Sequence, residues 1–304
     1  MKYRSNLEKV LSEKRFAVTA EIGPPKGSDP NKIKQKAEKL KGYADAFNIT
    51  DNQTAVVRMS SIAGCFILLQ MKMEPIMQIT CRDRNRIALQ SDILGASAIG
   101  IRNILCLTGD HQSFGNHPNA KGVFDIDSIQ LIQMLKNMRD SGFFQSGDEI
   151  IAGNPNVFIG AAANPFAEPL EFRVDRLNKK IQAGADFIQT QSVYNLDRFN
   201  SWMDEVRSNG FDKKVHILAG VTPLKSLKMA ERMKFYVPGV DLPDAIYERM
   251  KNADDPKKVG YETALEIINE LKNLKGVHGI HITALFWEDI IPSLVKDSGL
   301  RPRS

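Results

Sequence analysis

Short apolar runs recur along the chain, and a helical pattern or a polar turn follows each of them. The runs cover residues 15–22, 44–50, 75–81, 104–107, 156–163, 185–191, 214–220 and 279–285. Runs of this length that end in glycine, proline or polar residues are typical of buried parallel strands. Because these strands alternate with helical patterns and the composition shows no break, the sequence predicts the α/β class. The expected fold is a single (β/α)8 TIM barrel formed by residues 1–304 as one domain.

Apolar positions with helical spacing separate the predicted strands. The expected helices cover residues 6–14, 30–41, 58–71, 85–95, 170–183, 224–233 and 287–295, with another that starts near Asp127 and two more between residues 238 and 275. The longest irregular stretch covers residues 111–124 and is rich in His, Asn, Gly and Pro. Loops of this length are usually functional or mobile.

Polar side chains recur at the carboxyl ends of the predicted strands, which meet on the rim where TIM barrels carry their chemistry. Glu21 ends the first strand beside a Pro-rich loop. Apolar neighbours there would raise its pKa by desolvation and make it a usable general acid; the alternative is an ordinary solvated glutamate. Asp110 follows the fourth strand after Gly109, which lets a backbone or a flat ligand approach closely. For Thr50 and Gln78, a converging site and a structural hydrogen bond are the two alternatives.

The composition adds little about function. With 42% hydrophobic and 25% charged residues, the chain has the composition of a soluble globular protein. No apolar stretch approaches the ~20 residues of a membrane span, and the charged amino terminus lacks a signal-peptide core, so we expect a cytoplasmic protein. The net charge of +5 fits anionic ligands or simply a slightly basic enzyme. Because no basic cluster is interleaved with aromatic residues, we expect no nucleic-acid partner.

Neither cysteine nor histidine spacing predicts a metal site. Cys65, Cys81 and Cys106 are spread singly on apolar segments, which argues against a disulfide framework and a structural zinc site. The histidines lack a paired ligand spacing such as H-E-x-x-H. We therefore expect no catalytic metal.

Short motifs along the chain resemble those of the methylenetetrahydrofolate reductase family. They cover residues 20–25 (AEIGPP), 107–110 (LTGD), 185–191 (ADFIQTQ) and 220–223 (GVTP), in the order and spacing of that family. The resemblance extends from about residue 16 to residue 302 and implies a flavin-binding catalytic barrel. Unlike the longer eukaryotic members, this chain is not expected to carry a regulatory domain after residue 304.

The resemblance also implies roles for particular residues. The family's general acid falls on Glu21, its flavin-side aspartate on Asp110 and its substrate-binding glutamine on Gln191. The flavin contacts fall on Thr50, Gln78, Gly109, Asp110, Ala162 and Lys180.

The chain departs from well-studied bacterial members at several positions. Those members commonly carry His, Arg and Tyr where this chain has Gln78, Thr108 and Asn164. Because these departures affect contacts to the flavin phosphate and adenine, FMN is an alternative to FAD. Members also carry a substrate-stacking Phe at the position of Met233, which we expect at the substrate site.

The chemistry implied by the resemblance is reduction of 5,10-methylenetetrahydrofolate to 5-methyltetrahydrofolate in one-carbon metabolism. Ring opening to an N5 iminium needs a proton toward N10, which Glu21 would supply or relay, and flavin N5 then transfers hydride to the exposed carbon. Asp110 would hold the flavin potential down and stabilise the cationic iminium. Gln191 offers a donor and an acceptor to the pterin edge. The reductant is NADH, NADPH or a protein electron donor.

Two other readings remain open at this point. A flavin-free barrel could bind methyltetrahydrofolate and pass the methyl group to a corrinoid. Alternatively, the barrel could be a flavin subunit that depends on a partner subunit for electron entry. A homo-oligomer or such a partner subunit is therefore expected beside the folate substrate.

Overall fold

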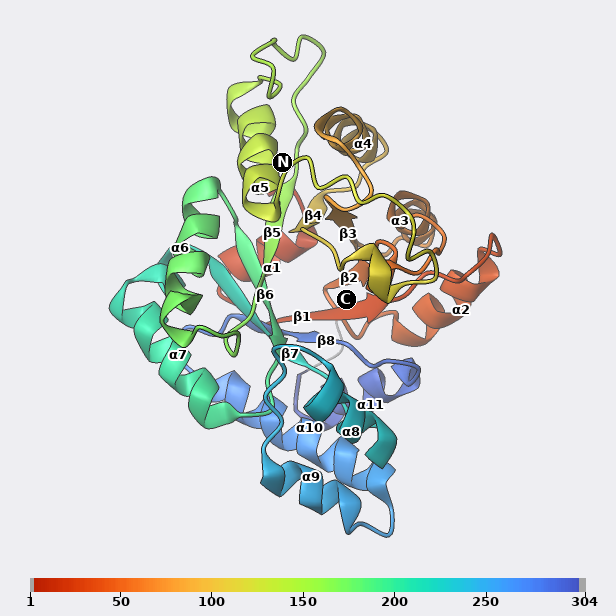
Figure 1. Ribbon diagram of the computed structural model, residues 1–304, viewed down its shortest axis with the longest axis vertical. Helices are drawn as coiled ribbons and strands as arrows, with labels where there is room; N and C mark the ends of the chain where they lie inside the picture. The colour runs from red at the N-terminus through yellow and green to blue at the C-terminus, as the bar shows by residue number, and fades with distance from the viewer. Residues whose placement is uncertain (1–2, 301–304) are drawn as a thin grey trace.

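Eight parallel strands close into a barrel in the computed structural model, which describes residues 3–300 (Figure 1). The strands are β1 (Ala17–Ile22), β2 (Ala46–Ile49), β3 (Pro75–Thr80), β4 (Asn103–Leu107), β5 (Phe158–Ala163), β6 (Phe187–Ser192), β7 (His216–Val221) and β8 (Gly279–Ile282). Each strand pairs with its sequence neighbours, and β1 closes on β8 with Ala17 opposite Gly279. The predicted α/β class and TIM-barrel architecture are confirmed.

Helices surround the barrel (Figure 1). They are α1 (Asn6–Ser12), α2 (Asn31–Leu40), α3 (Ser61–Gln70), α4 (Arg86–Ala98), α5 (Ser128–Lys136), α6 (Arg173–Ala183), α7 (Leu196–Ser208), α8 (Leu227–Tyr236), α9 (Asp244–Lys251), α10 (Pro256–Asn273) and α11 (Ile291–Asp297). The sequence patterns predicted no range for α7, although its buried Phe199, Trp202 and Val206 carry helical spacing.

Local side-chain hydrogen bonds explain where two of the helices begin. The Asp127 carboxylate accepts from the Gln130 N–H at 2.8 Å, and the Gln130 side chain accepts from the Asp127 N–H at 2.9 Å. This reciprocal pair is a capping box, and it starts α5 where the sequence predicted. Asn85 caps α4 in a similar way by accepting from the Ile87 and Ala88 N–H groups.

The two-residue period of the strands decides which side chains fill the barrel. At its amino-terminal end, an interior cluster packs against α1; it comprises Leu7, Val10, Leu11, Ala17, Ala46, Ile76, Leu105, Phe158, Phe187 and Leu218. Gly160 makes room there, because a Cβ at Gly160 would lie 2.3 Å from the Phe187 ring. Helix α1 and these side chains therefore close the amino-terminal end of the barrel as an apolar plug.

A polar layer lies above this plug. The Asn48 amide donates to Gln189 at 2.7 Å, Gln189 donates to the Thr19 hydroxyl at 3.2 Å, and Thr19 contacts His281 Nδ1 at 2.9 Å. These residues come from β1, β2, β6 and β8, so their contacts cross the barrel interior. Burial lowers the pKa of His281 to about 4, and the ring is neutral in this layer. The next inward position on β1 is Glu21.

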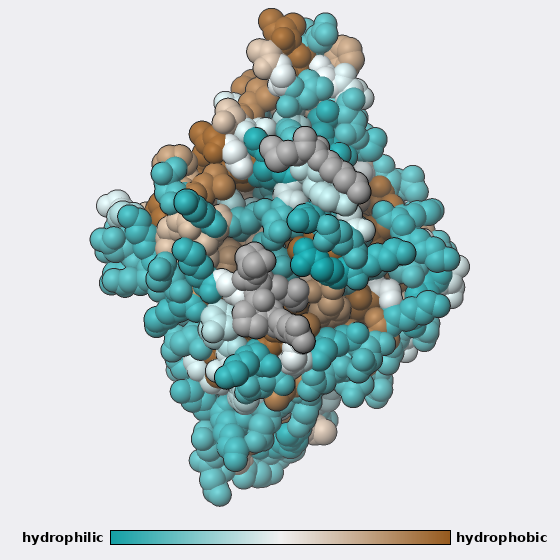
Figure 2. Space-filling model, turned by 180° about the vertical axis from the view of Figure 1, so that it is seen from behind, coloured by the Kyte–Doolittle hydropathy of each residue, from teal (hydrophilic) through white to brown (hydrophobic). Residues whose placement is uncertain are grey.

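The outer surface is uneven in polarity. Seen from behind, hydrophobic residues gather toward one end of the long axis, where segment 142–154 projects from the barrel (Figures 1 and 2). Ile151 in this segment is 91% exposed, and Phe143 is exposed as well. Across the described part of the chain, no helix combines the length and apolar character needed to cross a membrane.

Candidate active site

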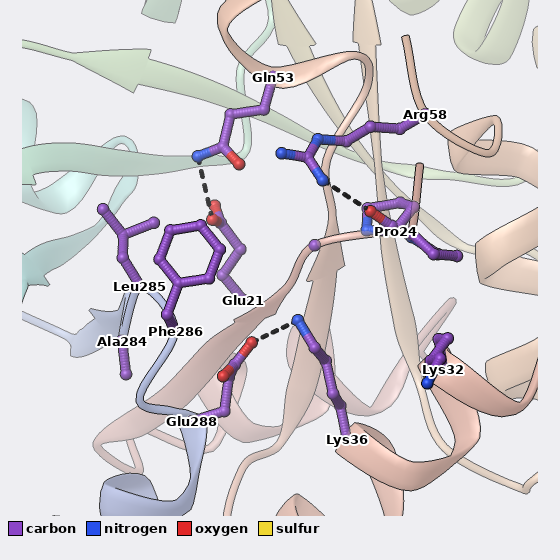
Figure 3. Close-up of a pocket in the computed structure, with 12 residues that line it drawn as sticks. Glu21, Pro24, Lys32, Lys36, Gln53, Arg58, Ala284, Leu285, Phe286 and Glu288 are labelled. Atoms are coloured by element: carbon purple, nitrogen blue, oxygen red, sulfur yellow. Dashed lines mark hydrogen bonds and ion pairs between the residues drawn. The ribbon is translucent and has the colours of Figure 1, made fainter. Parts of the chain in front are cut away.

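A pocket of about 280 Å³ opens at the carboxyl end of β1 (Figure 3). It is lined by Glu21, Gly23, Pro24, Pro25, Lys32, Lys36, Gln53, Arg58, Ala284, Leu285, Phe286 and Glu288. These residues come from the end of β1, from the loops after β1, β2 and β8, and from α2, which meet only when the barrel closes. The pocket therefore sits on the rim where the sequence analysis expected chemistry.

Among the residues that line this pocket, Glu21 has a strongly raised pKa. Burial raises its pKa from 4.5 to about 7, and the nearby carboxylate of Glu288 acts in the same direction. A hydrogen bond from the Gln53 amide, at 3.4 Å, and the positive charges of Lys36 and Arg58 oppose the shift without cancelling it. A carboxyl group with such a pKa can hold and release a proton near neutral pH.

The cations around Glu21 are partly engaged elsewhere. The Lys36 ammonium lies 2.5 Å from the Glu288 carboxylate, and Arg58 Nη1 donates to the Pro24 carbonyl at 3.1 Å (Figure 3). Since each cation has another oxygen partner, neither forms a close ion pair with Glu21. Desolvation consequently dominates the pKa of Glu21.

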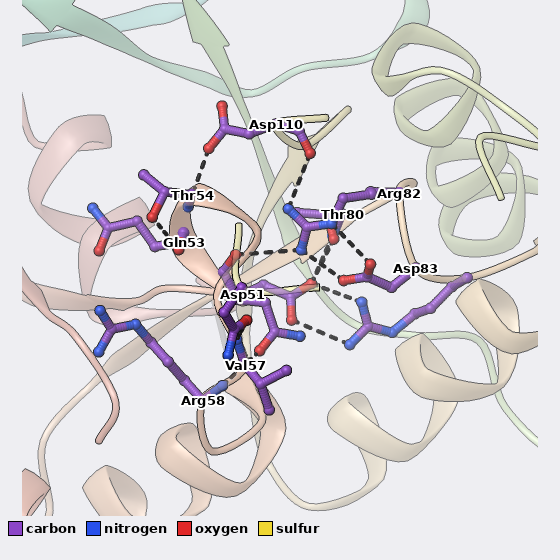
Figure 4. Close-up of polar contacts among 12 residues, drawn as sticks. Asp51, Gln53, Thr54, Val57, Arg58, Thr80, Arg82, Asp83 and Asp110 are labelled. Carbon is purple, nitrogen blue, oxygen red and sulfur yellow. Dashed lines mark hydrogen bonds and ion pairs between the residues drawn. The ribbon is translucent and has the colours of Figure 1, made fainter. Parts of the chain in front are cut away.

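Asp110 lies beyond the end of β4 and is exposed. Its carboxylate accepts from the Thr54 N–H at 3.1 Å, and its carbonyl accepts from Arg82 Nη1 at 3.2 Å (Figure 4). Thr54 belongs to the short helix η1 (Gln53–Ala55), whose first residue, Gln53, bonds Glu21. One turn after β2 thus contacts both acids that the sequence analysis selected, although no local pattern indicated such a role for it.

A buried ion cluster supports this turn and the neighbouring strand end. Asp51 accepts from the Thr80 N–H at 2.9 Å and from Arg84 Nη1 at 2.7 Å. Arg82, which is also buried, donates to the Asn52 carbonyl at 3.3 Å. The pairing of these residues depends on the register between β2 and β3. The cluster fixes the rim between Glu21 and Asp110.

The other residues predicted to contact a flavin are distributed around the same rim. Thr50 and Gln78 are buried at or near the ends of β2 and β3, and Ala162 lies half-buried on β5. Lys180 reaches from α6 to donate to the Ala162 carbonyl, and burial lowers the pKa of its ammonium. Gly109 has a φ of 93°, a conformation that side chains disfavour.

The two residues predicted to bind the substrate differ in exposure. Gln191 is half-buried at the end of β6, and its side-chain oxygen accepts from the Ser192 N–H at 3.1 Å. Its NH₂ group is the part that remains to donate to a ligand. Met233 lies on α8, is only 7% exposed and packs in the main hydrophobic cluster. Its role at the substrate site stays a prediction.

An unpaired polar atom marks the inner rim as suited to a polar ligand. The Thr50 hydroxyl is buried and has no hydrogen-bond partner within residues 3–300. Buried hydroxyl groups are nearly always paired, so this one is suited to a ligand such as the polar edge of a flavin ring. Within the same range, no group of three or more His, Cys, Asp or Glu side chains is arranged to hold a metal ion.

Proteins that match this chain in sequence are named methylenetetrahydrofolate reductases, in agreement with the family that the motifs resemble. The chain is 26% identical over 237 residues to methylenetetrahydrofolate reductase 2 of Schizosaccharomyces pombe, which covers 75% of this chain but only 36% of that protein. It is 24% identical over 234 residues to the 5,10-methylenetetrahydrofolate reductase of Escherichia coli, which covers 76% of this chain and 72% of the relative. The chain thus spans about a third of the yeast relative.

Solved structures share the fold. An uncharacterized protein from Clostridium thermocellum that binds two copies of 5-methyl-5,6,7,8-tetrahydrofolic acid matches 97% of this chain and 100% of its own, with a TM-score of 0.66 and 16% identity. The EDTA monooxygenase of Chelativorans sp. BNC1 matches with a TM-score of 0.56 and 13% identity. The family model described as methylenetetrahydrofolate reductase matches residues 6–299. The chain therefore belongs to the methylenetetrahydrofolate reductase family.

Proposed function

We propose that this protein reduces 5,10-methylenetetrahydrofolate to 5-methyltetrahydrofolate with the help of a bound flavin. The family supports the folate substrate and the reaction. The observation that carries the proposal is Glu21, a carboxyl group with a pKa of about 7 in a pocket at the catalytic rim of the barrel. A reaction that must protonate an amine nitrogen at neutral pH needs such an acid.

Thr50, Gln78, Gly109, Asp110, Ala162 and Lys180 would hold the flavin. The unpaired Thr50 hydroxyl and the small side chain of Ala162 support this assignment, because a flat ring with polar edges needs both. When bound, the flavin supplies two electrons to the substrate carbon. FAD and FMN both remain candidates, with NADH, NADPH or a protein as the electron donor.

Glu21 would deliver the proton toward N10 that opens the five-membered ring of the substrate. Gln53 donates to the Glu21 carboxyl group and orients it, while the apolar wall of the pocket keeps it protonated near neutral pH. The negative charge of Asp110 would stabilise the cationic iminium and disfavour an anionic reduced flavin. Gln191 would donate its free NH₂ group to the pterin.

The proposal also covers the setting in which the enzyme works. We expect a cytoplasmic protein that binds folate and acts either as a homo-oligomer or with a partner subunit that delivers electrons. The Clostridium thermocellum protein of the same fold binds 5-methyltetrahydrofolic acid, and this lends support to a folate ligand here.

The test uses the purified protein. We expect an absorption spectrum with flavin bands, and mass analysis of the released cofactor will identify FAD or FMN. After anaerobic chemical reduction, methylenetetrahydrofolate should reoxidise the bound flavin, and 5-methyltetrahydrofolate should appear in equal amount. A colourless protein that neither flavin reconstitutes would contradict the proposal, and methyltetrahydrofolate binding by that colourless protein would favour the methyltransferase reading. Flavin-loaded enzyme that neither NADH nor NADPH reduces would favour a partner subunit for electron entry.

A further inference from the structure

Phe286 combines an exposed ring with an unfavourable backbone conformation. The side chain is 80% exposed although phenylalanine is normally buried. Its φ of 55° lies in the left-handed region, which bulky side chains rarely occupy. The surrounding structure must therefore impose this conformation, and residues held in this way cluster at ligand sites.

The segment on either side of Phe286 is firmly held. Lys225 donates to the Phe286 carbonyl at 2.8 Å, and the Trp287 N–H donates to the Ala284 carbonyl at 3.1 Å. Glu288 is tied to Lys36 on α2, and the buried Trp287 ring anchors the chain next to Phe286. This turn also explains why β8 ends at Ile282, three residues before the predicted end. The neighbours are fixed, and the ring alone projects.

The Phe286 ring projects into the Glu21 pocket. Both residues line that pocket, and the ring lies beside the Glu21 carboxyl group in Figure 3. Gln53 and Arg58 line the same pocket, so an apolar ring and several polar groups border one space. Such a slot suits a planar ring that carries a polar or charged substituent.

We infer that Phe286 is the stacking residue for the p-aminobenzoyl ring of the folate substrate. The inference rests on the proposed function, in which Glu21 delivers a proton toward N10. N10 is bonded directly to the p-aminobenzoyl ring, so that ring must lie next to Glu21, in the pocket that the Phe286 ring also lines. The anionic glutamate end of the substrate then extends toward Lys32 and Arg58, which line the same pocket.

The first experiment separates binding from chemistry. In the flavin-loaded enzyme, Phe286→Ala should raise the KM for methylenetetrahydrofolate and the Kd for 5-methyltetrahydrofolate on the order of tenfold, the usual size of a lost aromatic contact. Phe286→Tyr and Phe286→Trp should stay within about twofold of wild type, since both keep a stacking face. The rate of flavin reduction and the pH at which folate turnover declines should not change. The matched control is Phe143→Ala, which removes an exposed ring that does not line the pocket.

A second pair of measurements distinguishes stacking from a structural role. Phe286→Gly should unfold at the same or a higher temperature than wild type, because glycine adopts a φ of 55° without strain. It should nevertheless bind folate as weakly as Phe286→Ala. A tetrahydropterin that lacks the aminobenzoyl-glutamate tail should bind wild type and Phe286→Ala equally.

Several results would overturn the inference. These are a Phe286→Ala Kd within twofold of wild type, failure of Tyr and Trp to preserve affinity, or equal losses for the tail-less pterin. Failure of the proposed function is distinguishable, because it shows in the wild-type protein as an inability to reduce methylenetetrahydrofolate. Binding of 5-methyltetrahydrofolate to wild type and Phe286→Ala still decides the stacking role in that case.

Discussion

Two partly buried glutamates in this barrel, Glu21 and Glu74, have raised pKa values but differ in their hydrogen bonds. The Glu74 carboxylate accepts from the Asn6 N–H at 2.6 Å, the Leu7 N–H at 2.8 Å and the Asn103 amide at 2.9 Å. Glu21 receives one long hydrogen bond, at 3.4 Å. Glu74 is thus committed to holding the start of α1, whereas Glu21 keeps oxygen lone pairs for a ligand. At the scale of a residue, the number of hydrogen-bond partners therefore identifies the proposed general acid better than its pKa does.

Replacement of Glu21 by Gln should affect only the step that needs a proton. The amide keeps the size of the side chain but cannot donate a proton at neutral pH, so reoxidation of the reduced flavin by methylenetetrahydrofolate should slow ~10²–10⁴-fold. In wild type this rate should fall as the pH rises above about 7, because the carboxyl group is then ionised. In Glu21→Gln the pH dependence should disappear.

Stopped-flow absorbance measures both half-reactions of the same variant, and flavin reduction by the donor is the internal control. If reduction slows as much as reoxidation does, Glu21 has a structural role. Unchanged reoxidation would show that another group supplies the proton.

At the scale of an element, the short turn η1 connects the two predicted acids. Asn52, Thr54 and Ala55 all have positive φ values between 45° and 55°, which is uncommon outside glycine. The loop around η2 (Gln112–Phe114) packs against this turn, and Asn116 there accepts from the Val57 N–H at 3.1 Å. The long loop 111–124 thus supports the turn that contacts Glu21 and Asp110.

Gly115→Ala should disturb this turn without unfolding the barrel. A Cβ at Gly115 would lie 1.8 Å from the Ala55 carbonyl oxygen, so the turn must move. Displacement of catalytic groups by about 1 Å can slow a reaction ~10²-fold, and we expect a loss of that order in folate turnover, with little change in Tm. The control is Gly95→Ala on α4, where a Cβ meets nothing within 4 Å. Full activity in Gly115→Ala would show that the turn does not position the acids.

At the scale of the whole molecule, stability and chemistry occupy opposite ends of the barrel. Helix α1 and an apolar plug close the amino-terminal end, whereas the Glu21 pocket opens at the carboxyl-terminal rim. This division is general for TIM barrels, whose loops at one end vary while the other end holds the fold.

Leu7→Ala tests this division. Leu7 is fully buried in the plug, so its truncation should lower the free energy of unfolding by ~2–5 kcal/mol. Folate turnover by the remaining folded protein at low temperature should match wild type. Urea unfolding and steady-state assays measure the two quantities, and Lys9→Ala on the exposed face of α1 is the control. A loss of turnover without a loss of stability would contradict the division.

Much of this architecture follows from local sequence. Apolar runs of strand length predicted every strand of the barrel, and the helical spacing of apolar residues predicted most helices. Both patterns are local, because they depend on which positions of a single strand or helix are buried. The motifs around Glu21, Asp110 and Gln191 are short and contiguous, so they indicate the family from sequence alone. Capping residues such as Asp127 also act within a few positions, and the start of α5 is predictable for that reason.

Closure of the barrel decided the rest. Thr19 and His281 are 262 positions apart, and Asn48 and Gln189 are 141 apart, yet they form one polar layer. The pocket around Glu21 likewise depends on Phe286 from the far end of the chain, whose exposure no local pattern predicts. Local patterns encode backbone conformation and burial, but contacts between strand ends depend on how all eight strands align. For that reason the sequence by itself determined the fold and the acids, while only the tertiary structure decided what surrounds those acids and sets their chemistry.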